Sequence, residues 1–422
     1  MAAAPHPFRI ANFRYYWAAR LVSMLAQSSM MLIIGWQAYN IARETMSPSA
    51  SAAQLGLIGL IQFVPLFALT PVTGWIADRI DRRFIARATI ALQFLCAAAL
   101  AWLTWTDAVS LPALFVVAAF IGIARAFSGP AIGALAPNLV PPEILPNAIA
   151  LGSIAWQAGM IVGPALGGYL YAWIPVAAYL ASAGLFLLAL TAFFLISPVP
   201  RPEVDRLRHP VRQMIDGVHY VRTNRIVLGA ISLDLFAVFL AGSTALLPIY
   251  ARDILKVGAE GLGHLSAAPA VGAALTALLF SFRPLKTNVG NKMLGAVIIF
   301  GIATIVFGLS TSMPLSLACL FVVGSADMFS VYVRQSLIQL STPDAMRGRV
   351  GAVSMLTISA SNELGEAESG FLAALIGPVA AVVAGGVGAI AITLLWAKWF
   401  PELRLARSFD TPKIGEPRET PT

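Results

Sequence analysis

The sequence predicts an all-α membrane protein of twelve transmembrane helices, arranged as two pseudo-symmetric six-helix bundles with both termini cytoplasmic. Three observations support this fold class: long apolar runs recur, basic residues gather in alternate loops, and the two halves share a weak repeat. Of the 422 residues, 58% are hydrophobic and only 11% are charged. A soluble domain has about 25% charged residues, whereas an apolar run of about 20 residues crosses a hydrocarbon core of roughly 30 Å.

The apolar runs define the predicted spans and the division of the chain. The spans are 15–42, 53–77, 84–106, 111–135, 144–172, 175–197, 226–250, 260–283, 291–311, 314–340, 347–376 and 378–400. One long polar interval, with four prolines and six arginines, separates the first six spans from the last six. We therefore predict a six-helix bundle over 1–197, a cytoplasmic basic linker over 198–225, a second six-helix bundle over 226–400 and a cytoplasmic tail over 401–422.

Lysine and arginine set the predicted orientation. With the N-terminus placed in the cytoplasm, 22 of the 28 basic residues fall on the cytoplasmic side, and only Arg43, Arg252 and Lys256 fall on the other. The remaining three lie inside spans. This distribution follows the positive-inside rule. The net charge of +8 therefore faces the anionic inner leaflet and does not indicate a nucleic-acid partner.

The two halves align with an offset of 202 residues. Residues 122–125 fall on 324–327, residues 163–164 on 365–366, and residues 168–170 on 370–372. The match is weak, but it covers three helices in order. Two related six-helix halves are typical of transporters that bind cargo near the bilayer midplane, between the halves.

A charged hairpin lies between spans 2 and 3, where residues 74–83 read Gly-Trp-Ile-Ala-Asp-Arg-Ile-Asp-Arg-Arg. It resembles the loop between helices 2 and 3 of the major facilitator superfamily, written G-x-x-x-D-R-x-x-R-R. The matching residues are Gly74, Asp78, Arg79, Arg82 and Arg83. The resemblance implies that Asp78 lies near the start of span 11 and helps to close the cytoplasmic side. A solvated cytoplasmic charge cluster is the simpler interpretation.

Span 5 contains glycines at i, i+4 and i+8, namely Gly159, Gly163 and Gly167, followed by Gly168. Such spacing makes a smooth face that another helix can approach closely, and Pro164 can bend the helix. The pattern resembles G-x-x-x-G-P-x-x-G-G, the antiporter motif of drug-exporting members of the superfamily, which implies export. Plain helix packing is the alternative.

Span 4 places Arg125 inside the membrane, where a charge costs several kcal/mol unless it faces protein or water. The stretch resembles the span-4 arginine motif of proton-linked members, which implies proton coupling or binding of an anionic group. The alternative is an arginine that fixes neighbouring helices through their carbonyl groups.

Carboxylates inside the later spans complete the predicted coupling site. Carboxyl groups that lose water in a membrane can bind and release protons near neutral pH. Glu363 and Glu366 share one face of span 11 at i and i+3, and Asp327 lies in span 10. The predicted proton-coupling residues are Asp234, Arg125, Asp327, Glu363 and Glu366. Two simpler interpretations are an Asp327–Arg334 ion pair, and a glutamate pair satisfied by Arg334, Arg125 or Asn362.

Polar and aromatic side chains within spans define the predicted substrate site. Arg20 and Gln27, seven residues apart, share one face of span 1. For Trp36, near the outer end of that span, an interfacial aromatic belt is the alternative. The full set is Arg20, Gln27, Trp36, Gln37, Arg125, Gln157, Asp327, Arg334, Asn362 and Glu366. The predicted gating residues are those of the hairpin and the span-5 motif, together with Arg347 and Arg349 at the start of span 11.

Further stretches resemble one branch of the superfamily. They are residues 12–14 (Asn-Phe-Arg), 20–23 (Arg-Leu-Val-Ser), 35–39 (Gly-Trp-Gln-Ala-Tyr) and 347–350 (Arg-Gly-Arg-Val). That branch contains enterobactin exporters, macrolide efflux pumps and related secretion effectors. The resemblance implies a monomeric, proton-coupled exporter of an amphipathic small molecule, such as a siderophore, drug or secondary metabolite, in a bacterial inner membrane. A lysophospholipid transporter, also found in this branch, is the alternative.

Other function classes find no support in the sequence. Cys96 and Cys319 lie in separate apolar runs, and the four histidines are scattered, so no metal-binding set is predicted. No nucleophile–base set indicates an enzyme, and the ATP-binding pattern G-x-x-x-x-G-K-[ST] is missing from the sequence. We therefore predict no cofactor and no use of ATP. The expected partners are the small-molecule cargo, protons and the lipid bilayer.

Overall fold

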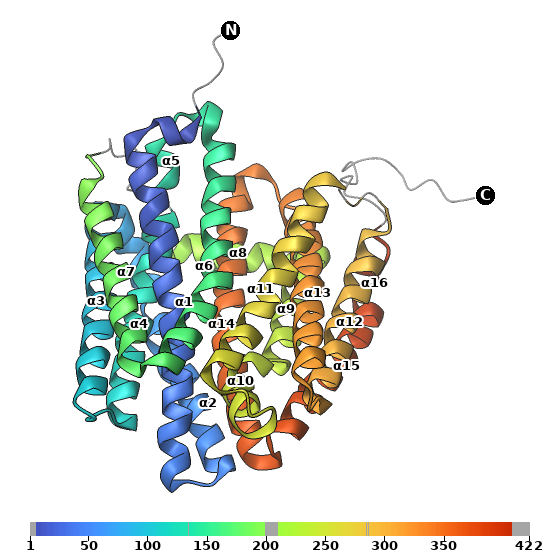
Figure 1. The fold of residues 1–422 in the computed structure, drawn as a ribbon. Helices are drawn as coiled ribbons and strands as arrows, with labels where there is room; N and C mark the ends of the chain where they lie inside the picture. The colour runs from blue at the N-terminus through green and yellow to red at the C-terminus, as the bar shows by residue number, and fades with distance from the viewer. Residues whose placement is uncertain (1–5, 134, 199–209, 284, 286, 407–422) are drawn as a thin grey trace, which may run out of the picture.

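A computed structural model describes residues 6–133, 135–198, 210–283, 285 and 287–406, and the regular structure of these residues is helical (Figure 1). The first long helices are α1 (Ala11–Thr45), α2 (Pro48–Arg79), α3 (Arg82–Trp105), α4 (Leu111–Gly133), α6 (Leu145–Trp173) and α7 (Pro175–Leu195). The later ones are α8 (Pro210–Thr223), α9 (Arg225–Leu240), α11 (Gly258–Phe282), α12 (Val289–Leu309), α13 (Met313–Leu340), α14 (Asp344–Ile376) and α15 (Pro378–Trp399). Short helices connect them: η1 (Pro7–Arg9), α5 (Ala136–Leu139), η2 (Pro142–Ile144), η3 (Ser243–Leu246), α10 (Leu247–Ile249), the π-helix η4 (Tyr250–Ile254) and α16 (Pro401–Arg404).

Eleven helices of the described residues are long and apolar enough to cross a membrane. The predicted span 347–376 corresponds to α14, which has 33 residues but lies outside that set and contains Glu363, Glu366 and Glu368. The first residues of several helices are determined by N-cap residues in the local sequence. Ser47, Asp81 and Asn224 accept hydrogen bonds from the first free N–H groups of α2, α3 and α9, as N-cap residues do.

The long helices form two groups. Helices α1–α7, here the first helix group, share an apolar core of residues between 13 and 196. Helices α9–α15 are here the second helix group, in which α9 and α12–α15 share a core of residues between 221 and 403 with the adjoining α8 and α16. Figure 1 shows the two groups side by side. We call the side at which α1 begins and α15 ends the terminus side, and the side at which α1 ends the opposite side.

A third apolar core joins the groups near the opposite side. It contains Trp36 and Tyr39 from the end of α1, residues 246, 247 and 249–251 of the second group, and residues of α2, α11 and α14. Glycines let the backbones approach closely there. A Cβ atom on Gly56 of α2 would lie 2.8 Å from the carbonyl oxygen of Ala367 in α14, and one on Gly263 of α11 would lie 2.9 Å from that of Pro164 in α6.

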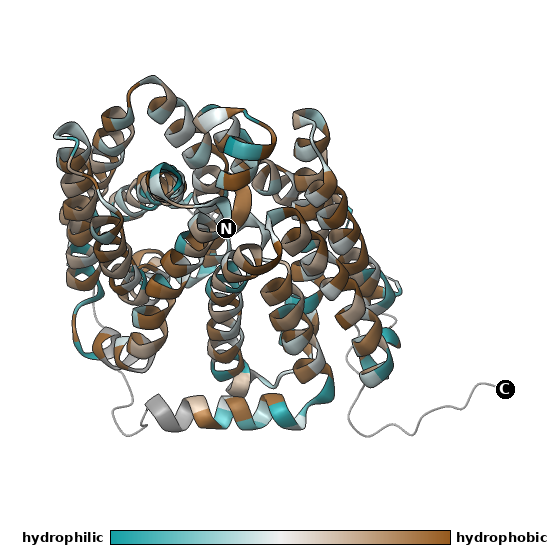
Figure 2. Cartoon of the chain, turned by 90° about the horizontal axis from the view of Figure 1, so that it is seen from below, coloured by the Kyte–Doolittle hydropathy of each residue, from teal (hydrophilic) through white to brown (hydrophobic). Residues whose placement is uncertain are grey.

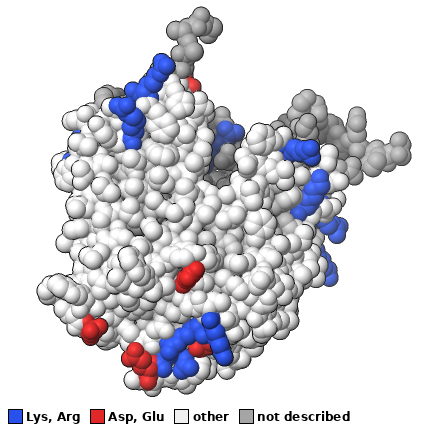
Figure 3. All heavy atoms as spheres, viewed as in Figure 1, with Lys and Arg blue, Asp and Glu red and all other residues white. Residues whose placement is uncertain are grey.

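The terminus side is open between the groups. Gly129 and Gly133 extend the face of α4 that contains Arg125, because the three lie four residues apart. A Cβ atom on either glycine, or on Gly348 or Gly351 of α14, would meet no atom within 4 Å among the described residues. Figure 3 shows the surface hollowed between the groups at this side. Residues facing this hollow, here the cleft, are therefore accessible from the terminus side.

Two features differ from the expected spans. The predicted helix 226–250 is interrupted after α9, where Gly242 lies against the Gly365 carbonyl of α14. The chain then continues through η3, α10 and the π-helix η4. The second feature is α8, a helix inside the expected basic linker. It lies across the bundle and alternates hydrophilic and hydrophobic residues along its length (Figure 2).

Candidate functional site

The strongest candidate site is an ion pair that joins the two helix groups. Arg125 Nη1 of α4 lies 2.6 Å from Glu363 Oε1 of α14, and it also donates a hydrogen bond to Gln62 Oε1 of α2 at 3.3 Å. Gly122 makes this reach feasible, because a Cβ atom there would lie 2.5 Å from the Gln62 carbonyl oxygen. Helices α2 and α4 therefore pack backbone to backbone one turn from the arginine.

Exposure differs sharply between the two partners. The Arg125 side chain is 28% exposed, whereas that of Glu363 is only 5% exposed. Glu363 uses one carboxylate oxygen for the arginine, and its second oxygen has no hydrogen-bond partner among the described residues. The pair thus lies at the inner wall of the cleft, with its arginine reachable by water and its glutamate enclosed.

Glu366 lies one turn from Glu363 on α14, as the i, i+3 spacing predicted. Its side chain is partly exposed, and it has no hydrogen-bond or ion-pair partner in the described part of the chain. Gly59 of α2 accommodates it, because a Cβ atom on Gly59 would lie 3.2 Å from Glu366 Cβ. Two carboxyl groups therefore lie one helical turn apart with an arginine bound to one of them, and the three groups sum to one negative charge when all are ionised.

Of the two predicted acids Asp234 and Asp327, it is Asp234 of α9 that pairs with an arginine. Arg334 of α13 pairs with Asp234 of α9, so the alternative Asp327–Arg334 pair is wrong. The side chains of Arg334 and Asp234 are 4% and 7% exposed, and both belong to the second helix group. Asp327 is partly exposed and has no ion-pair partner among the described residues. Rotation of α13 turns Arg334 toward α9, which sequence spacing along one helix does not reveal.

The predicted substrate residues of α1 separate into two sets. Arg20 and Gln27 are partly exposed, and Arg20 donates a hydrogen bond to the Tyr16 hydroxyl at 2.8 Å. Gln37 is buried inside the first helix group, where the Tyr179 hydroxyl donates to its side-chain oxygen at 2.5 Å. Trp36 is 8% exposed and packs in the core between the groups, which does not match the interfacial-belt alternative.

Two further predicted substrate residues, Gln157 and Asn362, lie on α6 and α14. Gln157 of α6 donates a hydrogen bond to the Ala270 carbonyl of α11 at 3.2 Å, which joins the two helix groups. Asn362 of α14 is exposed. Of Arg334, Arg125 and Asn362, it is Arg125 that pairs with Glu363.

The glycine motif of α6 packs against two different helices. Cβ atoms on Gly159 and Gly163 would lie 2.5 Å from Met24 Cβ and 2.8 Å from the Leu25 carbonyl oxygen, both in α1. Gly167 likewise faces Ser29 of α1. Gly168 instead faces Ala259 and Gly263 of α11, in the other group. The expected smooth face is confirmed, and its last glycine extends the contact across the groups.

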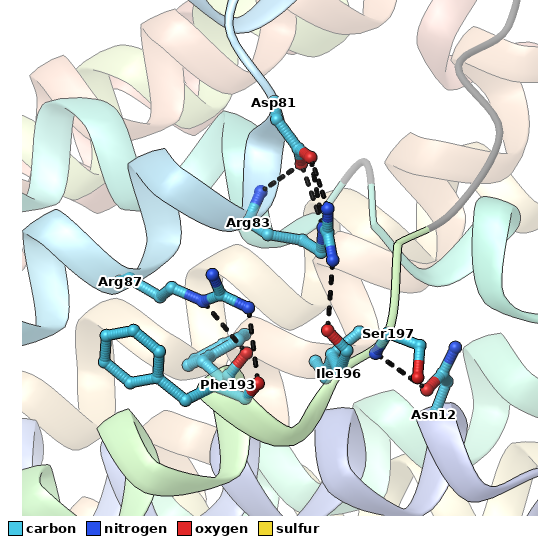
Figure 4. Close-up of polar contacts among 8 residues, drawn as sticks. Asn12, Asp81, Arg83, Arg87, Phe193, Ile196 and Ser197 are labelled. Atoms are coloured by element: carbon cyan, nitrogen blue, oxygen red, sulfur yellow. Dashed lines mark hydrogen bonds and ion pairs between the residues drawn. The ribbon is translucent and has the colours of Figure 1, made fainter.

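The charged hairpin anchors α3 to the end of α7 (Figure 4). Arg83 binds the Asp81 carboxylate at 2.7 Å and donates to the Ile196 carbonyl at 3.1 Å, while Arg87 donates to the Phe193 carbonyl at 3.1 Å. Both arginines thus satisfy free carbonyl groups at a helix C-terminus. Of Gly74 and Asp78 only the helical backbone within α2 is described, while Arg79 ends α2 and Arg82 begins α3.

The remaining gating candidates lie at the start of α14. Arg347 donates a hydrogen bond to the Gln339 carbonyl of α13 at 3.2 Å, and Arg349 donates to Asp216 of α8 at 3.3 Å. Both contacts lie outside the first helix group. Arg349 therefore connects the crosswise helix α8 to α14, and so links two segments that the sequence alone did not place together.

Sequence reasoning missed two features of the polar contacts. Gln62, a polar residue in the apolar run of span 2, is fully buried beside Arg125. Its amide in an otherwise apolar run was the available signal. The second feature is a polar network at the end of α1 around Asp253, whose arginines the sequence counted only as charges on the outer side.

This arrangement permits a specific chemistry. One arginine bound to one of two neighbouring carboxyl groups leaves a single negative charge uncompensated at the partly exposed Glu366, and a charge that is partly withdrawn from water is costly unless it is paired. One proton removes that charge. Because the pair also joins the two helix groups, a change in its charge changes a contact between them.

Known proteins resemble the chain along nearly its whole length. The family model described as Major Facilitator Superfamily matches residues 16–366. Enterobactin exporter EntS of Escherichia coli O1:K1 is 28% identical over 404 residues, which cover 94% of this chain and 93% of that protein. The protein of the same name from Shigella boydii is 29% identical with the same coverage.

Solved structures resemble the fold. A bacterial homologue of the human lysosomal transporter Spinster, in an inward-facing and occupied conformation, has a TM-score of 0.74 at 16% identity and covers 95% of this chain and 99% of its own. A D-xylose–proton symporter has a TM-score of 0.70 at 15% identity and covers 92% of this chain and 98% of its own.

Proposed function

We propose that this chain, which belongs to the major facilitator superfamily, exports an amphipathic small molecule across a bacterial inner membrane in exchange for protons. The family consists of transporters, and the chain is a multi-pass membrane protein. Export is favoured by the similarity to enterobactin exporters and by the glycine motif of α6. Enterobactin is accordingly the first cargo to test.

The proposed topology has twelve spans, with α14 as the helix beyond the eleven apolar ones, and both termini in the cytoplasm. The halves would be 1–197 and 226–400, joined by the linker 198–225 and followed by the tail 401–422. In this orientation the terminus side is cytoplasmic. The cleft would then be open to the cytoplasm, and the core around Trp36 and Tyr39 would close the outer side.

One observation supports proton coupling above the others: Arg125 of one helix group binds Glu363 of the other, with an unpaired Glu366 one turn away. When the cleft faces the cytoplasm, ionised Glu363 holds the groups together. A proton that enters from the outer side would neutralise one carboxyl group and weaken this contact. Asp327 is a second unpaired acid of the coupling set, whereas Asp234 is occupied by Arg334.

The proposed cargo site is the wall of the cleft. Its partly or fully exposed members are Arg20, Gln27, Arg125, Asp327, Asn362 and Glu366. Trp36, Gln37 and Arg334 are buried away from it, and Gln157 lies at the contact between groups. The gating role remains a proposal for the hairpin, the α6 glycines, Pro164, Arg347 and Arg349.

The test uses purified protein in proteoliposomes with an imposed proton gradient. Enterobactin transport and proton movement are measured together for the unchanged protein, Glu366→Gln and Asp327→Asn. We expect transport in the unchanged protein and loss of proton-driven transport in both variants, with folding retained. Unimpaired exchange in both variants would remove the coupling assignment. A parallel assay with fluorescent lysophospholipid tests the lipid alternative, because movement of that lipid without enterobactin transport would favour it.

A further inference from the structure

A polar network joins the end of α1 to the π-helix η4 on the opposite side. The Tyr39 hydroxyl donates a hydrogen bond to Asp253 Oδ2 at 2.5 Å, and Arg43 Nε donates to the same oxygen at 3.3 Å. Asp253 therefore accepts two hydrogen bonds from α1 while belonging to the other helix group. Hydrogen bonds to an ionised carboxylate are stronger than neutral ones.

The network is reciprocal. Arg252, the neighbour of Asp253, donates a hydrogen bond to the Asn40 carbonyl of α1 at 3.2 Å, and its guanidinium lies 6.0 Å from the centre of the Tyr39 ring. The end of α1 thus both donates to η4 and accepts from it. Several bonds between the same two segments resist sliding as well as separation.

The π-helix explains how two adjacent residues reach one partner. The Leu255 N–H bonds to the Tyr250 carbonyl five residues back at 2.7 Å, and the Val257 N–H bonds to the Ala251 carbonyl at 2.8 Å. This wider turn rotates successive side chains through a smaller angle than an α-helix does, so Arg252 and Asp253 both face α1. Short π-helical segments occur frequently at functional sites.

Partial exposure makes this network reversible. The side chains of Arg43, Asp253 and Arg252 are 24%, 28% and 32% exposed. Water can therefore solvate each charge once the bonds break, whereas the Arg334–Asp234 pair is 4% and 7% exposed and would leave buried charges. The core beneath the network is made of apolar side chains, and apolar packing holds the groups together without directional bonds.

We propose that Asp253 is a positioning residue of the transport cycle: it latches the end of α1 to the second helix group and sets how long the opposite side stays closed. This inference rests on the proposed alternating-access function. Tyr39 and Arg43 are the donors of the latch, and Arg252 with the Asn40 carbonyl forms its second arm.

The test measures access to the closed core with a cysteine reporter. Cys96 and Cys319 are replaced by alanine, and Ala52→Cys places one thiol at a fully buried position of the core between the groups. Right-side-out vesicles are treated with a membrane-impermeant maleimide. We expect Asp253→Ala to raise the labelling rate about tenfold and Asp253→Asn, which keeps one acceptor, to raise it less.

A second cysteine reporter distinguishes opening of the latch from unfolding of the protein, since both could raise labelling at the first reporter. Gly129→Cys lies on the open terminus side, where a Cβ atom meets nothing within 4 Å. In inverted vesicles, Asp253→Ala should lower the labelling of this thiol, because opening one side closes the other. A rise at both reporters would mean loss of structure and would overturn the latch, as would unchanged labelling at both.

Matched variants complete the experiment. Glu44→Gln removes one negative charge at an exposed position beside Arg43 and should leave both labelling rates unchanged. Arg43→Gln removes a donor of the latch without touching Asp253 and should reproduce its effect in part, so the proposal stays testable if Asp253→Ala does not fold. Labelling needs neither cargo nor a proton gradient, so failure of the export proposal and failure of the latch are distinguishable.

Discussion

The pairs Arg334–Asp234 and Arg125–Glu363 differ in the helices they join and in their exposure to solvent. Arg334 and Asp234 belong to one helix group and are 4% and 7% exposed. Arg125 and Glu363 belong to different groups, and the Arg125 side chain is 28% exposed. A pair that water cannot reach must remain intact, whereas a pair that borders a cleft can separate and be solvated. In the proposed export cycle, the first pair would maintain the fold and the second would change during transport.

The largest expected effect breaks the enclosed pair. Asp234→Asn leaves the Arg334 charge uncompensated in a site almost closed to water, and removal of one partner of such a pair costs about 3–5 kcal/mol. We expect a large loss of folded, monodisperse protein in detergent and a clearly lower unfolding temperature. Asp216→Asn, which removes an acid that is 48% exposed, is the control and should change neither. Normal stability of Asp234→Asn would remove the structural assignment.

A second prediction extends the comparison to packing within the first helix group. Gly163→Ala would place a Cβ atom 2.8 Å from both the Leu25 carbonyl oxygen and Ser28 Cβ of α1. Overpacking of this kind costs about 1–3 kcal/mol. Gly129→Ala adds the same methyl group to α4 where nothing lies within 4 Å, so its unfolding temperature should equal or slightly exceed that of the unchanged protein, because alanine favours a helix more than glycine does. Equal stability of the two variants would contradict the close approach of α1 and α6.

The third prediction breaks the pair that joins the groups. In Glu363→Gln, water in the cleft can solvate Arg125, so we expect a stability change of only about 1 kcal/mol. Proton-driven transport should nevertheless fall at least about tenfold, because the proton-sensitive contact between the groups is gone. Thermal unfolding and proteoliposome transport are measured on the same preparation. A variant with lost stability and normal coupling would reverse the two assignments.

The contrast between the pairs shows what sequence can and cannot supply. The length of the apolar runs located the spans. Within those spans, the charged side chains of Arg125, Asp234, Arg334 and Glu363 could be identified as groups that need partners in a membrane. Which residues pair depends on how each helix is rotated about its axis and on which helix it faces. The spacing of residues along a single helix carries no information on either. Arg334 was therefore assigned to Asp327 as an alternative, although it faces Asp234 of α9.

The same limit applies to backbone irregularities. Gly242 and Pro248 were visible in span 7, but the break after α9 follows from the approach of Gly365 in α14, a contact that is distant in sequence. Helix α8 did have a local signal, because Met214, Val218 and Val221 recur at helical spacing between polar residues. That signal was obscured by the prolines and arginines of the interval around it.

The smallest expected effect belongs to an ion pair that is open to solvent. Arg225 Nε of α9 lies 2.7 Å from Glu402 Oε1 of α16, and their side chains are 57% and 37% exposed. Exposed pairs contribute about 0–1 kcal/mol, so Arg225→Gln should leave transport unchanged and shift the unfolding temperature slightly at pH 7.

The direction in which the stability effect of Arg225→Gln changes with pH can also be predicted. A hydrogen bond from its own backbone N–H, followed by Arg225, lowers the pKa of Glu402. A group with a lowered pKa contributes stability above its unfolded pKa of about 4.3 and loses it as the pH falls through the folded value. The difference between Arg225→Gln and the unchanged protein should thus be constant from pH 7 to about 5 and shrink below about 4. A difference that grows on acidification would show that Arg225 acts through its Trp399 carbonyl contact and not through Glu402.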